Sequence, residues 1–289
     1  MAIKNLINGK SVDELTAHDR GLHYGDGLFE TITVENKQLL CWDEHLKRLE
    51  RGCVKLNIAV PDKNILKNEV SALIKTKSRG VIKIIISRGG GGRGYKISEN
   101  IEPTRIISLY PWSSQYDKNS SSGVKTRICS YRYAKNSFLA GIKHLNRLEQ
   151  ILARSEWDDD SIAEGIVMDS ENYIIEGTMS NIFCIIGKTL YTPDLSACGI
   201  EGIVREKIIE LASNLKFKDD LTSLNVEIKK IPLEFLMNAE EIFMCNSIIG
   251  VWPVNIIDKT KFSNHKKTQN IIKTLQEYNS IPKLCKNTN

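Results

Sequence analysis

The sequence predicts an α+β protein with two domains, and three observations lead to this. The chain has 289 residues, of which 41% are apolar and 26% charged, so it is long enough for one or two substantial cores. Its apolar residues alternate as in strands in some segments and recur at helical spacing in others, without a repeating strand–helix order. Residues 112–123 are polar and rich in serine, which is typical of a linker. We therefore expect a small α+β domain over residues 1–111 and a larger domain over residues 124–289.

The first domain is expected to combine strands with two helices. Alternating or continuous apolar runs predict strands at residues 3–8, 29–34, 38–41, 81–87 and 105–110. A helix is predicted behind Asp43, because apolar residues recur at helical spacing from residue 46 to residue 56. A second helix is predicted to begin at Pro61 and Asp62.

The second domain is expected to be richer in strands. These are predicted at residues 124–133, 163–168, 173–175, 181–186, 189–191, 226–230 and 241–245. Helices are predicted at residues 202–215, 232–237 and 269–278. No internal repeat or heptad pattern accompanies them.

Charge and cysteine content exclude several classes of protein. The net charge of +5 comes from 40 basic and 35 acidic residues spread along the chain, which indicates at most a mild preference for anionic substrates and no nucleic-acid partner. The seven cysteines are scattered without a CxxC pair, so neither a disulfide framework nor a zinc site is predicted. No segment reaches the roughly 20 apolar residues of a membrane span, and the N-terminus lacks the apolar core of a signal peptide. A cytoplasmic location without a membrane partner is expected.

Lys143 lies at the junction between an irregular segment and a helix-like run. Apolar residues precede it, and Leu145, Leu148, Ile151 and Leu152 follow at helical spacing, a pattern that requires one helix face to be buried. A desolvated lysine amine has a lowered pKa and becomes a nucleophile or base at neutral pH. An ordinary solvated lysine is the alternative, because lysine is among the most exposed residue types.

A glycine loop, SRGGGGRGY at residues 87–95, follows a predicted strand and contains the pattern G-x-G-x-x-G. The residues after it lack helical periodicity before Pro103 and no GK[ST] follows, so neither a dinucleotide fold nor a P-loop is predicted. Two interpretations remain. The loop is a flexible hairpin tip, or its glycines permit close backbone approach while Arg88, Arg93 and Tyr95 hold a carboxylate.

Other catalytic patterns are absent from the sequence. His18, Asp19, His23 and Asp26 match no metal-ligand spacing, so no metal is expected. There is no GxSxG motif, and no serine or cysteine is paired with a local histidine signal.

Six segments occur in the order found in the fold-type IV pyridoxal-phosphate (PLP) enzymes, and the chain resembles this family over nearly its whole length. They are HDRGLHYGDGLFET at residues 18–31, HLKRL at 45–49, the Lys143 segment, EGTMSNIF at 176–183, GIVR at 202–205 and CNSI at 245–248. The family includes branched-chain aminotransferases, D-amino acid aminotransferases and aminodeoxychorismate lyases. SRGGGGRGY and AGIKHLNRLEQ resemble the lyases most. The resemblance implies a small N-terminal α+β domain and a larger β-barrel-like domain with helices, which binds PLP.

The resemblance assigns cofactor roles to individual residues. Lys143 is expected to bond covalently to PLP and then to transfer protons. Glu176 is expected to face the pyridine nitrogen, where an anion strengthens the ring as an electron sink. Ile203 and Val204 begin a helix whose first N–H groups suit the phosphate, and Arg48 is the expected cationic partner of that phosphate. The other residues of the expected cofactor set are Asn181 and Ser247.

On the substrate side, the resemblance implies that Arg93 binds a carboxylate. Its expected companions are Arg88, Tyr24 and Tyr95. Thr31 is a candidate catalytic residue, since its hydroxyl can orient a leaving group where related aminotransferases often have glycine. An ordinary β-branched strand residue is the alternative for Thr31.

These inferences predict a PLP-dependent lyase that converts 4-amino-4-deoxychorismate to 4-aminobenzoate and pyruvate, a step toward folate. An aminotransferase of branched-chain or D-amino acids with the same fold and cofactor is the nearest alternative. A non-catalytic small-molecule or nucleotide-binding protein that uses the glycine loop is a second. The resemblance also implies a homodimer.

Overall fold

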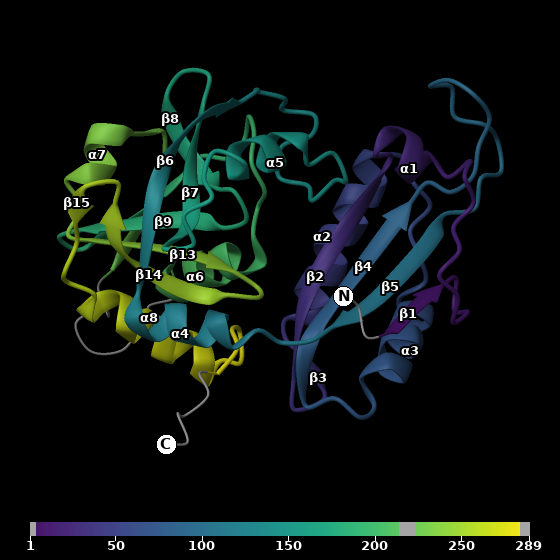
Figure 1. Cartoon of the computed structure of the whole chain (residues 1–289), viewed down its shortest axis with the longest axis horizontal. Coiled ribbons are helices and arrows are strands. Elements are labelled where there is room, and N and C mark those ends of the chain that lie inside the picture. Colours follow the sequence, from purple (N-terminus) through teal and green to yellow (C-terminus); the bar gives the residue numbers. More distant parts are fainter. Residues whose placement is uncertain (1–3, 214–223, 284–289) are drawn as a thin grey trace. The chain divides into compact units, whose positions relative to one another are not determined.

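The computed structural model describes residues 4–213 and 224–283, which form two compact units (Figure 1). Unit 1 consists of Met1–Trp112 and Ile142–Arg147, and unit 2 of Ser113–Gly141 and Leu148–Asn289. The first boundary lies next to the predicted end of the first domain at residue 111. The return of residues 142–147 to unit 1 differs from the prediction, which placed them in the second domain.

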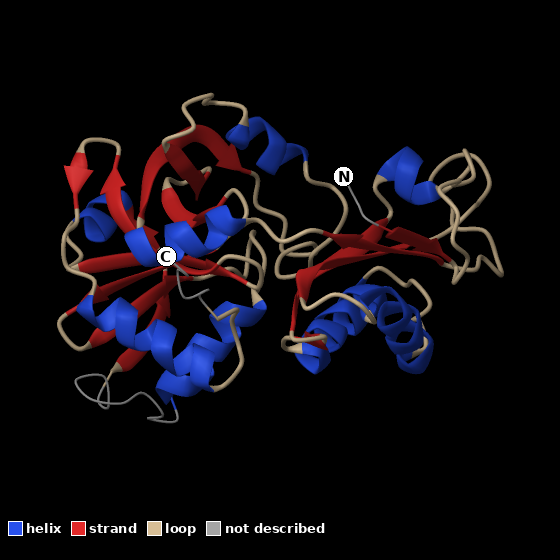
Figure 2. Cartoon of the chain, turned by 60° about the horizontal axis from the view of Figure 1, so that its bottom comes forward, coloured by secondary structure: helices blue, strands red, loops and turns tan. Residues whose placement is uncertain are grey.

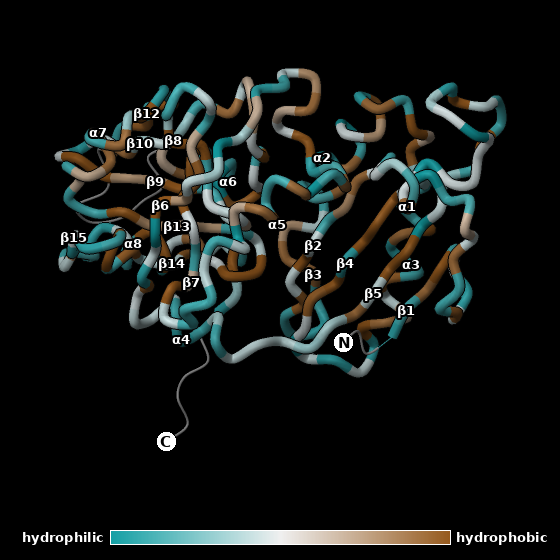
Figure 3. The backbone as a smooth tube through the Cα atoms, turned by 45° about the horizontal axis from the view of Figure 1, so that its top comes forward, coloured by the Kyte–Doolittle hydropathy of each residue, from teal (hydrophilic) through white to brown (hydrophobic). Residues whose placement is uncertain are grey.

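Unit 1 is built on an antiparallel five-stranded sheet with the order β1-β5-β4-β2-β3. Its strands are β1 (Lys4–Ile7), β2 (Gly27–Glu35), β3 (Gln38–Leu39), β4 (Arg79–Ser87) and β5 (Thr104–Tyr110). Helices α2 (Trp42–Lys55) and α3 (Lys63–Ile74) cover one face of this sheet (Figure 2). β4 is hydrophobic along most of its length (Figure 3), and its alternate residues Ile82, Ile84 and Ile86 are fully buried.

A short helix, α1 (Arg20–Tyr24), lies near the end of the sheet where the loop between β4 and β5 extends (Figure 1). Asp19 caps α1, because its side chain accepts a hydrogen bond from the Gly21 N–H at 2.8 Å. The glycine loop connects β4 to β5, which pair antiparallel, so it belongs to a hairpin connection. Both interpretations of the loop place it there, and the choice between them stays a prediction.

Unit 2 contains a mixed ten-stranded sheet with the order β11-β10-β9-β13-β14-β6-β7-β8-β12, and β15 pairs with β14. The strands are β6 (Val124–Tyr133), β7 (Ile162–Asp169), β8 (Tyr173–Gly177), β9 (Asn181–Ile186), β10 (Thr189–Pro193), β11 (Asn225–Lys229), β12 (Ile231–Pro232), β13 (Glu241–Asn246), β14 (Gly250–Ile257) and β15 (Thr260–Lys261). Its helices are α4 (Ser114–Ser122), α5 (Leu148–Arg154), α6 (Ile203–Ser213), α7 (Leu233–Met237) and α8 (Lys266–Glu277). The end of the predicted helix at residues 214–215 lies outside the described residues. β14 is a strand that the sequence analysis did not predict.

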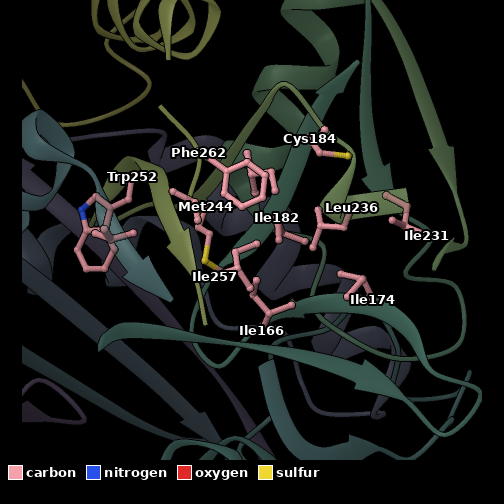
Figure 4. Close-up of a cluster of buried hydrophobic side chains, with 14 of the residues drawn as sticks. Ile166, Ile174, Ile182, Cys184, Ile231, Leu236, Met244, Trp252, Ile257 and Phe262 are labelled. Carbon is pink, nitrogen blue, oxygen red and sulfur yellow. The ribbon is translucent and has the colours of Figure 1, made fainter. Parts of the chain in front are cut away.

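The sheet of unit 2 is buried on both faces. Along β9, Phe183 and Ile185 pack with α6 and α8, whereas Ile182 and Cys184 point into a second cluster. That second cluster also contains side chains from β7, β8 and β12, at the other end of the strand order (Figure 4). The sheet must therefore curl until its distant strands share one interior, which confirms the expected barrel-like form. Burial on both faces also explains why β9 is a continuous apolar run.

The predicted linker at residues 112–123 is wrong in its main part, because residues 114–122 form helix α4 on unit 2. Ser120 Oγ donates to the Val251 carbonyl at 2.8 Å, and Trp252 Nε1 donates to the Tyr116 carbonyl at 3.2 Å. The serine-rich composition misled the prediction, since these tertiary contacts with β14 stabilise a helix whose own hydrophobicity is low.

The helix expected after Lys143 also differs from the prediction. It begins only at Leu148, because residues 143–145 pair with β2 as an extended segment. Its predicted apolar face is not buried within the described chain, where Leu148 is 72%, Ile151 60% and Leu152 51% exposed. Only Ala153 of this helix is buried.

Candidate active site

Lys143 lies against the edge of β2 in unit 1. The Phe29 N–H donates to the Lys143 carbonyl at 2.9 Å, and the Leu145 N–H donates to the Gly27 carbonyl at 2.9 Å. This pairing fixes the direction of the half-buried lysine side chain, whose Nζ lies 4.5 Å from the centre of the Phe29 ring. The predicted lysine is therefore held by a regular backbone contact and lies over an aromatic face.

The same aromatic ring contacts a second lysine that the sequence analysis missed. Lys83 Nζ lies 5.3 Å from the centre of the Phe29 ring, and Lys83 pairs with Thr31 across β4 and β2. Phe29 and Thr31 share one face of β2, because alternate residues of a strand point the same way. Burial lowers the pKa of Lys83. The sequence feature that could have identified Lys83 is its position inside the run VIKIIIS, in which every other residue except the final serine is apolar.

Arg48 lies on the opposite face of β2 and is held by Glu30, another residue that the sequence analysis missed. Its Nε donates to Glu30 Oε1 at 2.9 Å and its Nη2 to Glu30 Oε2 at 2.5 Å. His45, one turn earlier on α2, contacts Glu30 Oε2 through Nδ1 at 2.6 Å. All three side chains are buried. Arg48 is thus part of a buried ion pair rather than an exposed helix face.

Burial decides the charge of the histidine in this group. Burial raises the pKa of Glu30, but the interactions with Arg48 and His45 outweigh burial. The pKa of Glu30 therefore falls to about 2. Burial lowers the pKa of His45 despite its contact with Glu30. His45 is therefore neutral at pH 7 and donates its Nδ1 hydrogen to the carboxylate. Its Nε2 is buried without a hydrogen-bond partner in the described part of the chain.

In unit 2, Glu176 on β8 is only 3% exposed and accepts hydrogen bonds from two neutral groups. Its Oε2 accepts from the Ile200 N–H at 2.9 Å and from Asn181 Nδ2 at 3.3 Å. Asn181 also donates to the Ile200 carbonyl at 2.9 Å. Glu176 and Asn181, both predicted, therefore meet at the turn that precedes α6.

Gly202 ends that turn and leads into α6. A Cβ there would lie 2.0 Å from Asn181 Oδ1, so any side chain at this position would displace Asn181. The first intrahelical bond runs from the Glu206 N–H to the Gly202 carbonyl at 2.9 Å. The N–H groups of Ile203 and Val204, at the start of the helix, consequently have no acceptor within α6. The turn and the first residues of α6 thus present backbone N–H groups close to the buried carboxylate of Glu176.

Another buried carboxylate, Glu164 on β7, organises the loop between β8 and β9. It accepts from Thr178 Oγ1 at 2.5 Å, from Ser180 Oγ at 2.8 Å and from the Met179 N–H at 3.2 Å. Burial raises the pKa of Glu164, and these neutral donors do not reverse that effect. The loop that connects Glu176 to Asn181 is therefore fixed at several points.

Ser247 follows β13 and is half-buried. The preceding residue, Asn246, accepts from the Ile248 and Ile249 N–H groups at 2.8 and 2.9 Å, and its Nδ2 donates to the Met179 carbonyl at 2.9 Å. The turn that carries Ser247 is thus fastened to the loop that Glu164 holds.

The predicted substrate residues of the glycine loop differ in environment. Arg88 is buried, with Nε and Nη2 on Asp26 at 2.7 and 2.9 Å and Nη1 on the Asn57 carbonyl at 2.7 Å. These contacts give Arg88 a structural role, and its contact with a substrate carboxylate stays a prediction. Arg93 is exposed and Tyr95 is 86% exposed, with the Tyr95 ring 5.6 Å from that of Tyr24.

The two units together have the architecture of the fold-type IV PLP enzymes. A crystal structure of 4-amino-4-deoxychorismate lyase from Pseudomonas aeruginosa matches with a TM-score of 0.88 and 36% sequence identity, over 96% of this chain and 100% of that one. The fold class expected from the sequence is confirmed.

The family follows from the sequence comparisons. The profile of the family described as Amino-transferase class IV matches residues 27–257, so the chain belongs to this family. An aminodeoxychorismate lyase of Vibrio harveyi is 36% identical over 86% of this chain and 89% of its own length. A putative branched-chain-amino-acid aminotransferase of Methanocaldococcus jannaschii is 27% identical over 95% of this chain and 94% of its own length.

Enzymes of this family depend on PLP, and the expected cofactor is confirmed at this level. The residues present fit it. An anionic phosphate suits the first N–H groups of α6, where Gly202 keeps side chains away. The buried carboxylate of Glu176 suits a protonated ring nitrogen, and the amine of Lys143 suits a covalent bond to the cofactor aldehyde.

Proposed function

We propose that this enzyme is a lyase that converts 4-amino-4-deoxychorismate to 4-aminobenzoate and pyruvate. The observation that carries the proposal is the face of β2 on which the Lys143 and Lys83 amines both approach the Phe29 ring. Thr31 adds a hydroxyl to the same face. A second cation near the reactive amine suits a substrate with two carboxylates. The 36% identity with a lyase over most of both chains agrees with this proposal.

The cofactor residues act as follows in the proposed reaction. PLP, when bound, supplies an electron sink for charge that develops on the carbon bearing the substrate amine. Glu176 holds the ring nitrogen in its protonated form, and the N–H groups of Ile203 and Val204 bind the phosphate. Arg48 adds positive charge for the same phosphate, and Glu30 fixes its orientation. Asn181 positions Glu176, and Ser247 adds a hydroxyl to the phosphate.

The substrate residues move the proton and bind the carboxylates. Lys143 removes the proton from the amine-bearing carbon. The Thr31 hydroxyl orients the departing enolpyruvyl oxygen, and Lys83 and Arg93 neutralise the substrate carboxylates. Aromatisation of the ring makes the elimination strongly downhill, so the side chains have only to position groups and transfer a proton.

Purified enzyme incubated with aminodeoxychorismate, without an amino-group acceptor, is expected to release 4-aminobenzoate and pyruvate in equal amounts. Lys143→Ala is expected to lower turnover about 10³-fold and to remove the absorption band of covalently bound cofactor. Lys47→Ala is the control, because Lys47 is an exposed lysine of α2. Unchanged turnover and absorption in the Lys143 variant would contradict the proposal.

An aminotransferase of branched-chain or D-amino acids is the second candidate, supported by the aminotransferase relative at 27% identity. It predicts that addition of an amino acid donor alone converts bound PLP to pyridoxamine phosphate. The lyase predicts product release without a donor. Absorption spectra recorded after each addition distinguish the two functions.

A homodimer is the proposed assembly, and α5 is the face that a second copy covers. Leu148, Ile151 and Leu152 of α5 are 72%, 60% and 51% exposed, and Phe138, which precedes α5 in unit 2, is 83% exposed. Several exposed apolar side chains on one short helix suit a protein interface. Ile151→Glu is expected to shift the sedimentation of the enzyme from dimer to monomer, whereas Ile65→Glu on α3, at a site that is 45% exposed, leaves the dimer intact. Dimeric sedimentation of both variants would rule out α5.

The enzyme is further proposed to act in the cytoplasm, in folate biosynthesis. The six cysteines of the described residues are all unpaired with one another, which suits a reducing compartment. In the same part of the chain, no helix combines the length and the apolar character that crossing a bilayer demands. Complementation of a strain that requires 4-aminobenzoate tests the pathway assignment.

A further inference from the structure

The glycine loop is fastened to α1 by one buried side chain. Arg20, which is 4% exposed, donates from Nη1 to the Gly94 carbonyl at 2.9 Å and approaches the Tyr95 carbonyl with Nη2 at 3.5 Å. These two carbonyls belong to the residues that directly follow Arg93. The Tyr24 hydroxyl accepts from the Gly94 N–H at 3.3 Å. The main chain next to Arg93 is therefore held by Arg20 and Tyr24, two side chains of a single short helix.

The guanidinium of Arg20 is itself oriented on two sides. Its Nε donates to Asp26 Oδ2 at 3.0 Å, and its Cζ lies 4.8 Å from the centre of the Tyr24 ring. Asp26 also binds Arg88, at the root of the same loop. Burial raises the pKa of Asp26, but Arg88 and Arg20 outweigh it and the pKa is lowered. One carboxylate thus fixes both the root of the loop and the side chain that holds its tip.

The glycines of the loop leave space for this arrangement. A Cβ on Gly91 would lie 3.0 Å from Arg20 Cδ and 3.1 Å from Ile101 Cδ1. Gly89 has a φ of +95°, and a Cβ there would lie 2.0 Å from the Glu102 carbonyl oxygen. Glycine is thus required at Gly91 partly because the Arg20 side chain lies so close to it. The glycines also increase the entropy cost of ordering the loop when no side chain holds it.

Arg93 itself is exposed and makes no ion pair within residues 4–213 and 224–283. Its neighbours in the chain are fixed through main-chain atoms, which leaves its guanidinium available to an external anion. An exposed cation on a main chain that is already fixed suits a carboxylate-binding loop, because the entropy cost of ordering the loop is met before the ligand binds.

We propose that Arg20 is a positioning residue that fastens the tip of the glycine loop, so that Arg93 is presented to a substrate carboxylate. The identity of that carboxylate rests on the proposed lyase function, whereas the fastening itself does not. Loss of Arg20 raises KM rather than lowering kcat, because a loosely held loop weakens binding of the substrate and of the transition state alike.

The test compares Arg20→Met with Arg93→Met and with the double variant, each as the PLP-loaded enzyme. Arg20→Met is expected to raise KM about tenfold with kcat changed less than about twofold. The double variant is expected to have the KM of Arg93→Met alone, because both changes remove one interaction. Arg79→Met is the matched control. Arg79 also pairs with a carboxylate, Glu35, and stacks on an aromatic ring, Trp112, but it lies at the other end of β4.

A second measurement does not depend on the reaction. Trypsin is expected to cut after Arg93 about tenfold faster in Arg20→Met than in wild type or Arg79→Met, since the local opening that cleavage requires becomes easier. If wild type has no lyase activity, this rate still tests the fastening, so failure of the proposed function is distinguishable from failure of this proposal.

Gly91→Ala and Tyr24→Phe provide variants that keep all charges, should Arg20→Met not fold. Gly91→Ala crowds Arg20 Cδ, and Tyr24→Phe removes the acceptor of the Gly94 N–H. Each is expected to raise KM and the rate of cleavage after Arg93 about threefold, as expected for loss of part of the interaction. Unchanged KM and cleavage in the variants that fold, or additive effects in the double variant, would overturn the proposal.

Discussion

Glu30 of unit 1 and Glu164 of unit 2 are equally buried, each 1% exposed, but their surroundings differ in charge. Glu30 binds the guanidinium of Arg48 and the imidazole of His45, whereas Glu164 binds hydroxyl and amide groups. Burial raises the pKa of both carboxyls. Arg48 and His45 together reverse that effect at Glu30, and the neutral donors around Glu164 do not. Several neutral hydrogen bonds therefore do not replace one buried positive charge.

The same contrast separates the residues assigned to the cofactor in unit 1 from those assigned to it in unit 2. In unit 1, Arg48, Lys143 and Lys83 contribute charged side chains. In unit 2, the turn before α6 contributes backbone groups around Gly202, and Asn181 holds Glu176. We therefore expect changes of charge to have large effects at the side chains of unit 1, and changes of shape to have large effects at the turn around Gly202 in unit 2.

The largest effect on stability is expected from Glu30→Gln. It replaces the buried carboxylate that the Arg48 guanidinium binds with a neutral amide, which is expected to lower the free energy of unfolding by about 3–5 kcal/mol. Urea unfolding at pH 7 measures this change. Glu69→Gln is the control, because the Glu69–Arg105 pair is partly exposed and contributes at most about 1 kcal/mol. An equal decrease in the free energy of unfolding of the two variants would show that the buried Glu30–Arg48 pair contributes no more to stability than the partly exposed Glu69–Arg105 pair.

Opposite pH dependences are expected next. The folded-state pKa of Glu30 lies below its unfolded value, so its contribution to stability is present above about pH 4.5 and is lost as the pH falls toward 2, by about 3 kcal/mol in all. Glu164 has a raised folded-state pKa, so its contribution is present at low pH and decreases as the pH rises through that value. The free energy of unfolding of the wild type and of each glutamine variant, determined across this pH range, measures the contributions of Glu30 and Glu164. If the contributions of Glu30 and Glu164 changed with pH in the same direction, the contrast between the two carboxylates would be contradicted.

Glu164→Gln is expected to cost less than Glu30→Gln at pH 7. An amide retains one acceptor for Thr178 and Ser180, and no buried cation loses its partner, so the free energy of unfolding falls by about 1–3 kcal/mol. Ser180→Ala, which removes one donor, is the matched variant with a cost of about 1 kcal/mol. If Glu164→Gln lowered the free energy of unfolding as much as Glu30→Gln does, Glu164 would have to neutralise a buried positive charge, as Glu30 does.

Gly202→Ala changes shape without changing charge. Its Cβ displaces Asn181, so the apparent dissociation constant of PLP is expected to rise about tenfold, which corresponds to about 1.4 kcal/mol. Titration of apo-enzyme with PLP measures it. Gly90→Ala is the control, because the nearest atom to its Cβ would be Thr16 Cγ2 at an ordinary 3.8 Å. Equal PLP affinity in both variants would show that the turn tolerates a side chain.

The sequence identified residues whose local motif is distinctive. Lys143, Arg48 and Glu176 each lie in a short segment that resembles the family. Their roles at the cofactor stay predictions, and the structure adds that Glu176 contacts Asn181. The residues that hold them in place, such as Glu30 and Glu164, could not be found in this way. Their contacts depend on which strand faces which helix, and neither alternation nor helical spacing contains that information.

The errors have a related physical cause. Helix α4 has a polar sequence, and its contacts with Val251 and Trp252 come from residues more than a hundred positions later. Residues 143–145 continue a helical pattern of apolar residues, but pairing with β2 makes them extended. In both segments tertiary contacts outweigh local propensity, which is a weak determinant in short elements.

The pairing of residues 143–145 with β2 also has a consequence for biosynthesis. β2 leaves the ribosome long before its partner at Lys143 is made, and its edge at Gly27–Phe29 then presents unpaired backbone groups to other nascent chains. Completion of unit 1 must wait until the first strand of unit 2, β6, has been synthesised. Chains that terminate before residue 142 are expected to associate through that open edge.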